Sequence, residues 1–274
     1  MKTSLGTFML IFSISTLFCQ TNNLTIKKSG DGNQQIILIS GLACKNEIWH
    51  KTVDSLATDA TIYSVDYYND FNHQLTTIDV ITNQIFNWIE KQKISNPILV
   101  GHSLGGVLAL NVASKLNGNI EKLVIIDSYP ALAALSNPNF TPNTNNNCLP
   151  LVKQFSAMTP EQFKNFQLGN YRQMTLNDIE RTKLIEWVIA YNRNNYSMLL
   201  CDYLNTDLRT SLNAINCPTL ILGSKTMTAL KDHISKQYKS LKAHKLIFSK
   251  KGLHFLMIDD FDWYIEKIKD FIKQ

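Results

Sequence analysis

The residues with the clearest chemical potential are Gly101-His102-Ser103-Leu104-Gly105, which match a Gly-x-Ser-x-Gly pattern. They follow the apolar run Pro97–Val100 and precede a helix-like stretch over 106–113. A serine on a sharp turn between a strand and a helix projects its hydroxyl above the sheet, and small flanking residues let the backbone make that turn. The pattern and its context therefore predict that Ser103 is a nucleophile.

A nucleophilic serine needs a base, and His254 is the best candidate among the six histidines. A hydroxyl is a weak nucleophile unless a neighbouring group removes its proton. His254 stands in Lys251-Gly252-Leu253-His254-Phe255, between the last predicted strand and the last predicted helix. His102 lies inside the turn itself. We expect structural or solvated roles for the other four, which fall in predicted helices, loops or a strand: His50, His73, His233 and His244.

Strand-like and helix-like segments alternate along most of the chain, and they must position these side chains. This alternation predicts an α/β fold, with right-handed crossovers and a mostly parallel sheet covered by helices on both faces. The expected strands are 35–40, 61–66, 98–100, 123–126, 218–223 and 244–248, and the expected helices are 46–58, 78–91, the stretch after Ser103, 229–241 and 257–272.

The alternation stops between about residues 129 and 215, where no buried strand is evident. A loop rich in proline and asparagine covers 137–150, and helices are expected over 160–171 and 178–203. We expect a helical insertion over the carboxyl ends of the strands, where ligands bind in open α/β sheets. Its apolar and aromatic residues can line a pocket for a small, mostly apolar molecule, and no Arg or Lys stands out as a clamp for an anion.

The serine turn, the late His254 and the order of strands and helices resemble the α/β-hydrolase family, in its capped, esterase-like form. The resemblance covers about residues 34–272. It implies an eight-stranded sheet, a Ser-acid-His triad and no metal or organic cofactor. It also implies an oxyanion hole made by the backbone N–H groups of Leu42 and Leu104, each contributing roughly 3 kcal/mol. Ser40-Gly41 stands where many members have His-Gly, but the donor is a backbone group.

The acid of the triad departs from the common family pattern. Many members carry Asp shortly after the strand that follows the cap, and here that stretch, 222–228, has no carboxylate. The alternative position at the end of the strand before the cap holds Asp127, which can orient the far ring nitrogen of His254. Asp232, further along in a predicted helix, and the absence of a conventional acid are the other possibilities.

The N-terminus has the features of a secretory leader. Met1-Lys2 precedes an apolar stretch from Leu5 to Phe18, which is too short for a membrane span, and a polar exit follows. We expect a leader over 1–19 and a bacterial protein exported to the periplasm or secreted, with no stable membrane span after leader removal. Lipidation at Cys19 is the less favoured alternative. The remaining domains are a core over 20–128 and 216–274 and a cap over 129–215.

The composition of the chain limits the kinds of partner that we expect it to bind. The chain has 274 residues, a net charge of +5 and no cluster of Lys and Arg interleaved with aromatics, so we expect no nucleic-acid partner.

Four cysteines follow the leader, with spacings unlike those of a zinc site or a redox pair. A Cys148–Cys201 disulfide and isolated buried thiols are both compatible with Cys44, Cys148, Cys201 and Cys217. The sequence does not indicate an oligomeric state.

Together these features predict a serine hydrolase that cleaves an ester or related acyl bond of a small molecule through an acyl-enzyme. A peptidase, a lactonase or a carbon–carbon bond hydrolase could use the same residues, because a fold does not choose among them. A binding protein that keeps the scaffold without turnover is the alternative from another class.

Overall fold

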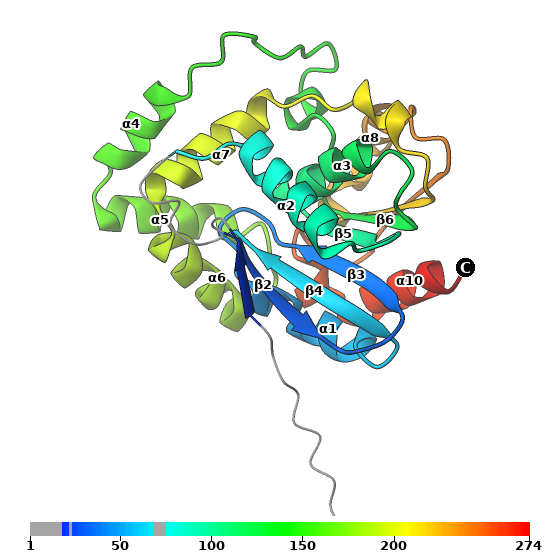
Figure 1. Ribbon diagram of the computed structural model, residues 1–274. Coiled ribbons are helices and arrows are strands. Elements are labelled where there is room, and N and C mark those ends of the chain that lie inside the picture. The colour runs from blue at the N-terminus through cyan, green and yellow to red at the C-terminus, as the bar shows by residue number, and fades with distance from the viewer. Residues whose placement is uncertain (1–17, 22–23, 68–74) are drawn as a thin grey trace, which may run out of the picture.

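In the part of the chain that the structure describes, eight strands form one sheet in the order β1-β2-β4-β3-β5-β6-β7-β8 (Figure 1). The computed structural model describes residues 18–21, 24–67 and 75–274. β2 pairs antiparallel with β1 and β4, and all other pairs are parallel, which confirms the predicted mostly parallel α/β sheet. The strands are β1 (Phe18–Thr21), β2 (Leu24–Ser29), β3 (Gln34–Ile39), β4 (Ala60–Asp66), β5 (Ile98–His102), β6 (Lys122–Ile126), β7 (Thr219–Gly223) and β8 (His244–Phe248).

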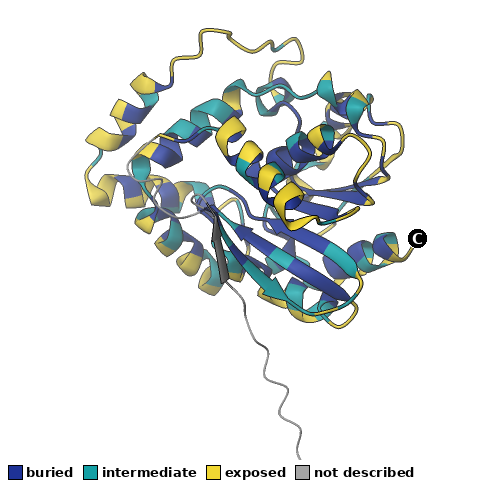
Figure 2. Ribbon diagram, in the orientation of Figure 1, coloured by how far each residue is buried: buried dark blue, intermediate teal, exposed yellow. Residues whose placement is uncertain are grey.

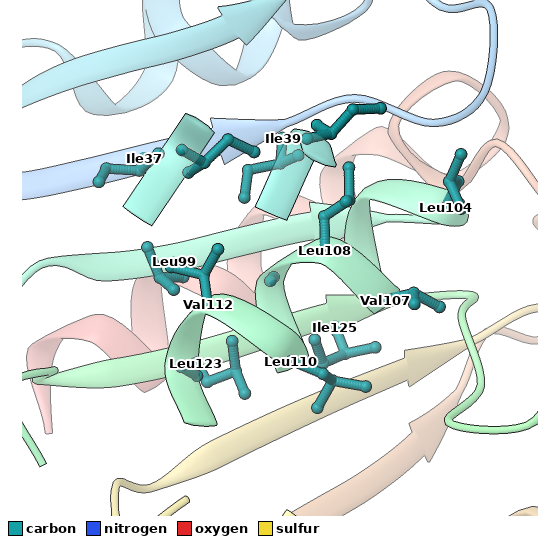
Figure 3. Packing of buried hydrophobic residues seen from close by; sticks show 14 of the residues in the cluster. Ile37, Ile39, Leu99, Leu104, Val107, Leu108, Leu110, Val112, Leu123 and Ile125 are labelled. Carbon is teal, nitrogen blue, oxygen red and sulfur yellow. The ribbon is translucent and has the colours of Figure 1, made fainter. Parts of the chain in front are cut away.

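Helices cover both faces of the sheet because the parallel strands are apolar on both sides. Ile37, Leu99 and Ile125 face one layer, which contains α2, α3 and α8, and Figure 3 shows α3 packed on these strands. Alternate residues such as Val100 and Val124 face the layer of α1 and α10. The strands at the centre are accordingly buried (Figure 2). The bounds are α1 (His50–Leu56), α2 (Ile78–Gln92), α3 (Leu104–Leu116), α8 (Lys231–Gln237), α9 (Leu256–Asp259) and α10 (Phe261–Lys273), with 3₁₀ turns η1 (Asn46–Trp49), η2 (Leu132–Leu135), η3 (Ser211–Ala214) and η4 (Lys225–Leu230).

Between β6 and β7 the chain forms α4 (Leu149–Ala157), α5 (Pro160–Tyr171), α6 (Asp178–Ala190) and α7 (Arg193–Asn205). The single helix expected over 178–203 is wrong: it is broken into α6 and α7. The side chain of Asn192 caps the start of α7 by accepting hydrogen bonds from the N–H groups of residues 194 and 195, so the chain begins a new helix there. α4 was not expected beside a loop rich in proline, yet Pro150 lies in its first turn, where a missing N–H costs little.

Most of the predicted leader, residues 1–17, lies outside the described residues, as does His73. Phe18 and Cys19 belong to β1, so removal of residues 1–19 would leave only the second half of that strand. Among the residues that the structure describes, no helix combines the length and the apolar character needed to cross a membrane.

Cys148 and Cys201 form a disulfide, whereas Cys44 and Cys217 are free, buried thiols. The disulfide joins the start of α4 to α7 across 53 residues. Closing a loop of this length removes conformational entropy from the unfolded chain, which corresponds to about 4 kcal/mol in the simplest model.

We expect the double variant Cys148→Ser/Cys201→Ser to be about 2–4 kcal/mol less stable than the oxidised protein, with a Tm lower by about 5–10 °C. Thermal unfolding followed by circular dichroism measures the difference. A reductant should lower the Tm of the wild type and leave the double variant unchanged. Equal melting temperatures for the oxidised wild type and the double variant would contradict the prediction.

Candidate active site

Ser103 occupies the sharp turn between β5 and α3. Its backbone has φ +54° and ψ −125°. Residues other than glycine rarely adopt this conformation, which persists only when neighbouring contacts hold it. The Ser103 N–H donates to the carbonyl of Ile126 at 3.0 Å. Gly105 is required because a Cβ at that position would lie 2.2 Å from the carbonyl oxygen of Ile39. The predicted turn therefore forms, and tight backbone packing holds Ser103 at the carboxyl end of β5.

His254 and Asp127 meet although 127 residues separate them. His254 Nδ1 lies 2.7 Å from Asp127 Oδ2, and both residues line one pocket with Ser103. His254 stands on the loop between β8 and α9, and its side chain is 23% exposed, whereas that of Asp127 is 2% exposed. Since a carboxylate only accepts, Nδ1 donates and the other ring nitrogen, Nε2, is left to act as a base.

Two further donors hold the carboxylate of Asp127. Its Oδ1 accepts from the hydroxyl of Tyr129 at 2.9 Å and from the N–H of Ser224 at 2.8 Å. Burial alone would raise the pKa of Asp127, but the hydrogen bonds from His254, Ser224 and Tyr129 hold this pKa below its ordinary value. Asp127 is therefore ionised at neutral pH.

Ser224 lies just after β7, the position for which the α/β-hydrolase resemblance implies an acid, and its backbone N–H donates to the carboxylate of Asp127 after the neighbouring strand β6. Asp232, the alternative acid, is an exposed residue of α8 and does not line the pocket. Sequence reasoning missed the supporting roles of Tyr129 and Ser224. The sequence offers one signal for the role of Tyr129, which is that a tyrosine stands two residues after the candidate acid. It offers none for Ser224, because the donor there is a backbone N–H.

The substitution Tyr129→Phe removes one donor to Asp127 and keeps the ring. We expect a higher pKa for Asp127 and a kcat about tenfold lower, because a hydrogen bond to a charged group contributes about 1.5 kcal/mol. Steady-state kinetics on a short ester should show the loss in kcat with little change in KM. Tyr196→Phe is the matched control, because Tyr196 lines the same pocket and donates to Gln167 instead. Equal kinetics for the two variants would refute the supporting role of Tyr129.

Leu42 and Leu104, the expected oxyanion donors, flank Ser103 along two chain segments. Leu104 is the first residue of α3, so its N–H has no partner within the helix. Leu42 lies in a turn closed by a hydrogen bond from the N–H of Cys44 to the carbonyl of Gly41. A Cβ added at Gly41 would lie 3.1 Å from Ser103 Cβ, so this turn passes directly beside the serine. The segments that carry both predicted donors therefore lie next to Ser103, and their role as an oxyanion hole stays a prediction.

His102 is fully buried, and its contacts indicate a structural role. Its Nε2 lies 3.0 Å from the carbonyl oxygen of His254, which can only accept, so Nε2 carries the proton. Burial, followed by the nearby His254, lowers the pKa of His102 to about 3, and the ring stays neutral. His102 therefore holds the backbone of the His254 loop, a contact that sequence reasoning did not identify.

The loop with His254 is also tied to the chain between β6 and β7. The N–H of Phe255 donates to the carbonyl of Met174 at 3.1 Å. Asp259 bridges the two segments: its Oδ1 accepts from Thr175 Oγ1 at 2.6 Å, and its Oδ2 accepts from the N–H of Leu253 at 3.0 Å. The position of His254 thus depends on contacts with the turn that follows α5.

The pocket has a volume of about 230 Å³ and is lined mostly by apolar and aromatic side chains. Cys44 contributes a thiol to it, but burial, followed by the charge of Asp66, raises the pKa of this thiol to about 12. Cys44 is therefore protonated at neutral pH and is not a competing nucleophile. Within the described part of the chain, no three His, Cys, Asp or Glu side chains are grouped so that they could hold a metal ion.

The chain is similar to known hydrolases over most of its length. The model of the alpha/beta hydrolase fold family matches residues 35–261. A pimeloyl-[acyl-carrier protein] methyl ester esterase of Vibrio atlanticus is 28% identical over 209 residues, which cover 71% of this chain and 76% of that protein. Its counterpart in Vibrio parahaemolyticus is 24% identical over 268 residues, covering 92% and 98%. The enol-lactonase from Burkholderia xenovorans superposes with a TM-score of 0.76 at 15% identity, covering 94% of this chain and 100% of that one.

Proposed function

This chain belongs to the α/β-hydrolase fold family and is an esterase-like hydrolase, and from that premise we propose that it cleaves carboxylic esters of small, mostly apolar molecules through an acyl-enzyme. The observation that carries the proposal is the 2.7 Å contact between His254 and Asp127 in the pocket that contains Ser103. The names of the curated relatives, which are methyl ester esterases, support an ester as the substrate.

In the proposed reaction, Ser103 Oγ attacks the ester carbonyl while Nε2 of His254 takes its proton. The N–H groups of Leu42 and Leu104 stabilise the negative oxygen of the tetrahedral intermediate. The intermediate then collapses, the C–O bond to the alcohol breaks, and the imidazolium of His254 returns the proton to the leaving alcohol. Water repeats the sequence on the acyl-enzyme, releases the acid and restores Ser103.

Asp127 orients His254 in this reaction and stabilises the imidazolium that forms. Its contacts with Tyr129 and Ser224 keep it charged and in place. The chemistry requires only groups of this chain, the ester and water.

A fluorophosphonate probe tests the proposed function directly. We expect one probe per chain on Ser103 by intact and peptide mass spectrometry, and no labelling of Ser103→Ala. Ser136→Ala is the matched control, because Ser136 is exposed and lies outside the pocket. If the folded wild type fails to label and hydrolyses no p-nitrophenyl ester, the chain is a binding protein on a hydrolase scaffold and the proposal is wrong.

We also propose that the protein is exported to the bacterial periplasm or secreted. The leader-like residues 1–19 support export, and so does the Cys148–Cys201 disulfide, because disulfides persist in oxidising compartments. Fractionation of cells that express the full chain should recover the protein outside the cytoplasm, with an N-terminus near residue 20. Recovery of the intact chain in the cytoplasm would contradict export.

A further inference from the structure

One helix, α7, supplies the inner wall of the pocket. Tyr196, Leu200 and Tyr203 line the pocket and recur at spacings of four and three residues, so they share one face of α7. The two tyrosines are buried, whereas Leu200 is partly exposed and lines the cavity between them. The aliphatic side chain of Leu200 is therefore the part of this wall that a substrate chain would meet.

Three separate contacts fix α7 in place. The Cys148–Cys201 disulfide ties it to α4. Asp202 Oδ2 accepts from the N–H of Ile78 at 2.8 Å, and Asn195 Oδ1 accepts from the N–H of Thr76 at 3.3 Å, which join α7 to the start of α2. Because α7 is held on both sides, a substrate that is too long cannot easily displace it. The position of α7 therefore limits the length of substrate that the pocket accepts.

The volume of the pocket indicates how long a substrate can be. Its volume of about 230 Å³ lies below the range of about 300–1,000 Å³ that is usual for pockets of drug-sized ligands, so the pocket suits a small molecule. The carbonyl carbon and the two ester oxygens take part of this space, so a short chain fits beside them better than a long one. The alcohol leaves first, whereas the acyl group stays on Ser103 and must fit the pocket until water releases it.

The residues that line the pocket also disfavour a charged acyl chain. Among the described residues that line the pocket, there is no Lys, Arg or Glu, and Asp127 is the one acidic side chain. Both oxygens of Asp127 are occupied by donors from the protein. A charged group on the acyl chain would lose its water without meeting a side chain of opposite charge that is free to pair with it, which is costly.

We propose that α7 restricts the acyl group to a short, uncharged chain, and that Leu200 sets this limit. The inference rests on the proposed esterase function and adds to it the length and charge of the acyl group. It makes Leu200 a specificity-determining residue that contacts the substrate chain.

The test compares kcat/KM for p-nitrophenyl esters from acetate to decanoate, below the concentrations at which they form micelles. For the wild type we expect a fall of about tenfold or more between hexanoate and decanoate, since a pocket with a fixed wall accommodates the added methylenes poorly. Leu200→Ala should raise the ratio of decanoate to butanoate about tenfold. Leu200→Phe should do the opposite, losing hexanoate while keeping acetate.

Leu204→Ala is the matched control, because Leu204 is on the same helix, is 43% exposed and does not line the pocket. Its length profile should equal that of the wild type. The inference is overturned if the wild type accepts all lengths equally, or if the substitutions at Leu200 and Leu204 have the same effect. Failure of the esterase function itself gives a different result: no ester is hydrolysed and Ser103 is not labelled, which overturns both proposals.

Discussion

Replacing Ser103 with alanine is expected to reduce kcat for ester hydrolysis by about 10⁵- to 10⁶-fold, because removal of the nucleophile disables the whole catalytic unit. The fold should be unaffected. The strained backbone at this position is held by the bond from its own N–H to Ile126 and by the close packing of Gly105, and neither contact uses the hydroxyl.

Kinetics on a short p-nitrophenyl ester and a thermal melt measure both parts of this prediction. Ser103→Ala should keep the Tm of the wild type within about 2 °C, since surface and polar truncations of this kind change stability little. Ser136→Ala should leave both quantities unchanged. Substantial turnover by purified Ser103→Ala would show that another group attacks the ester.

Replacing Asp127 with asparagine is expected to lower kcat about 10⁴-fold through the tautomer of His254. The N–H of Ser224 can only donate, so the amide oxygen of the new side chain must take the place of Oδ1. The amide NH₂ then faces Nδ1 of His254, which must accept, and the ring proton moves to Nε2. A protonated Nε2 cannot take the proton of Ser103.

Asp232→Asn is the control for Asp127→Asn, since Asp232 is exposed on α8 and outside the pocket. It should retain the activity of the wild type. Both variants are measured with the same ester and checked for folding by circular dichroism. If Asp232→Asn loses activity while Asp127→Asn keeps it, the assignment of the acid is wrong.

The order of the elements could be predicted from the sequence because each central strand is a short run of apolar residues between helical patterns. β2 escaped notice: its signal is the weaker alternation of Leu24 and Ile26 with half-buried polar residues, as suits an antiparallel strand near the edge of the sheet. The division into α6 and α7 was also missed. It depends on the single cap at Asn192, which the periodicity around it does not reveal.

Ser103 and His254 could be proposed from sequence because local patterns identify a serine turn and a loop after the last strand. The choice of Asp127 over Asp232 was a prediction from the elements that precede them, and the contact that favours it lies across three strands and 127 residues. The hydroxyl of Tyr129 reaches Asp127 only because the chain turns just after β6, where Asp127 has φ +42°.

The sequence by itself determined which residue types are available for chemistry and predicted the edge of the sheet at which they meet, because residue types and local periodicity act over a few residues. Only the tertiary structure decided which carboxylate meets His254, which donors hold it and how large the pocket is. Those outcomes depend on distances near 3 Å between segments far apart in the chain, and such distances are set by the packing of the whole core together with the disulfide that joins α4 to α7.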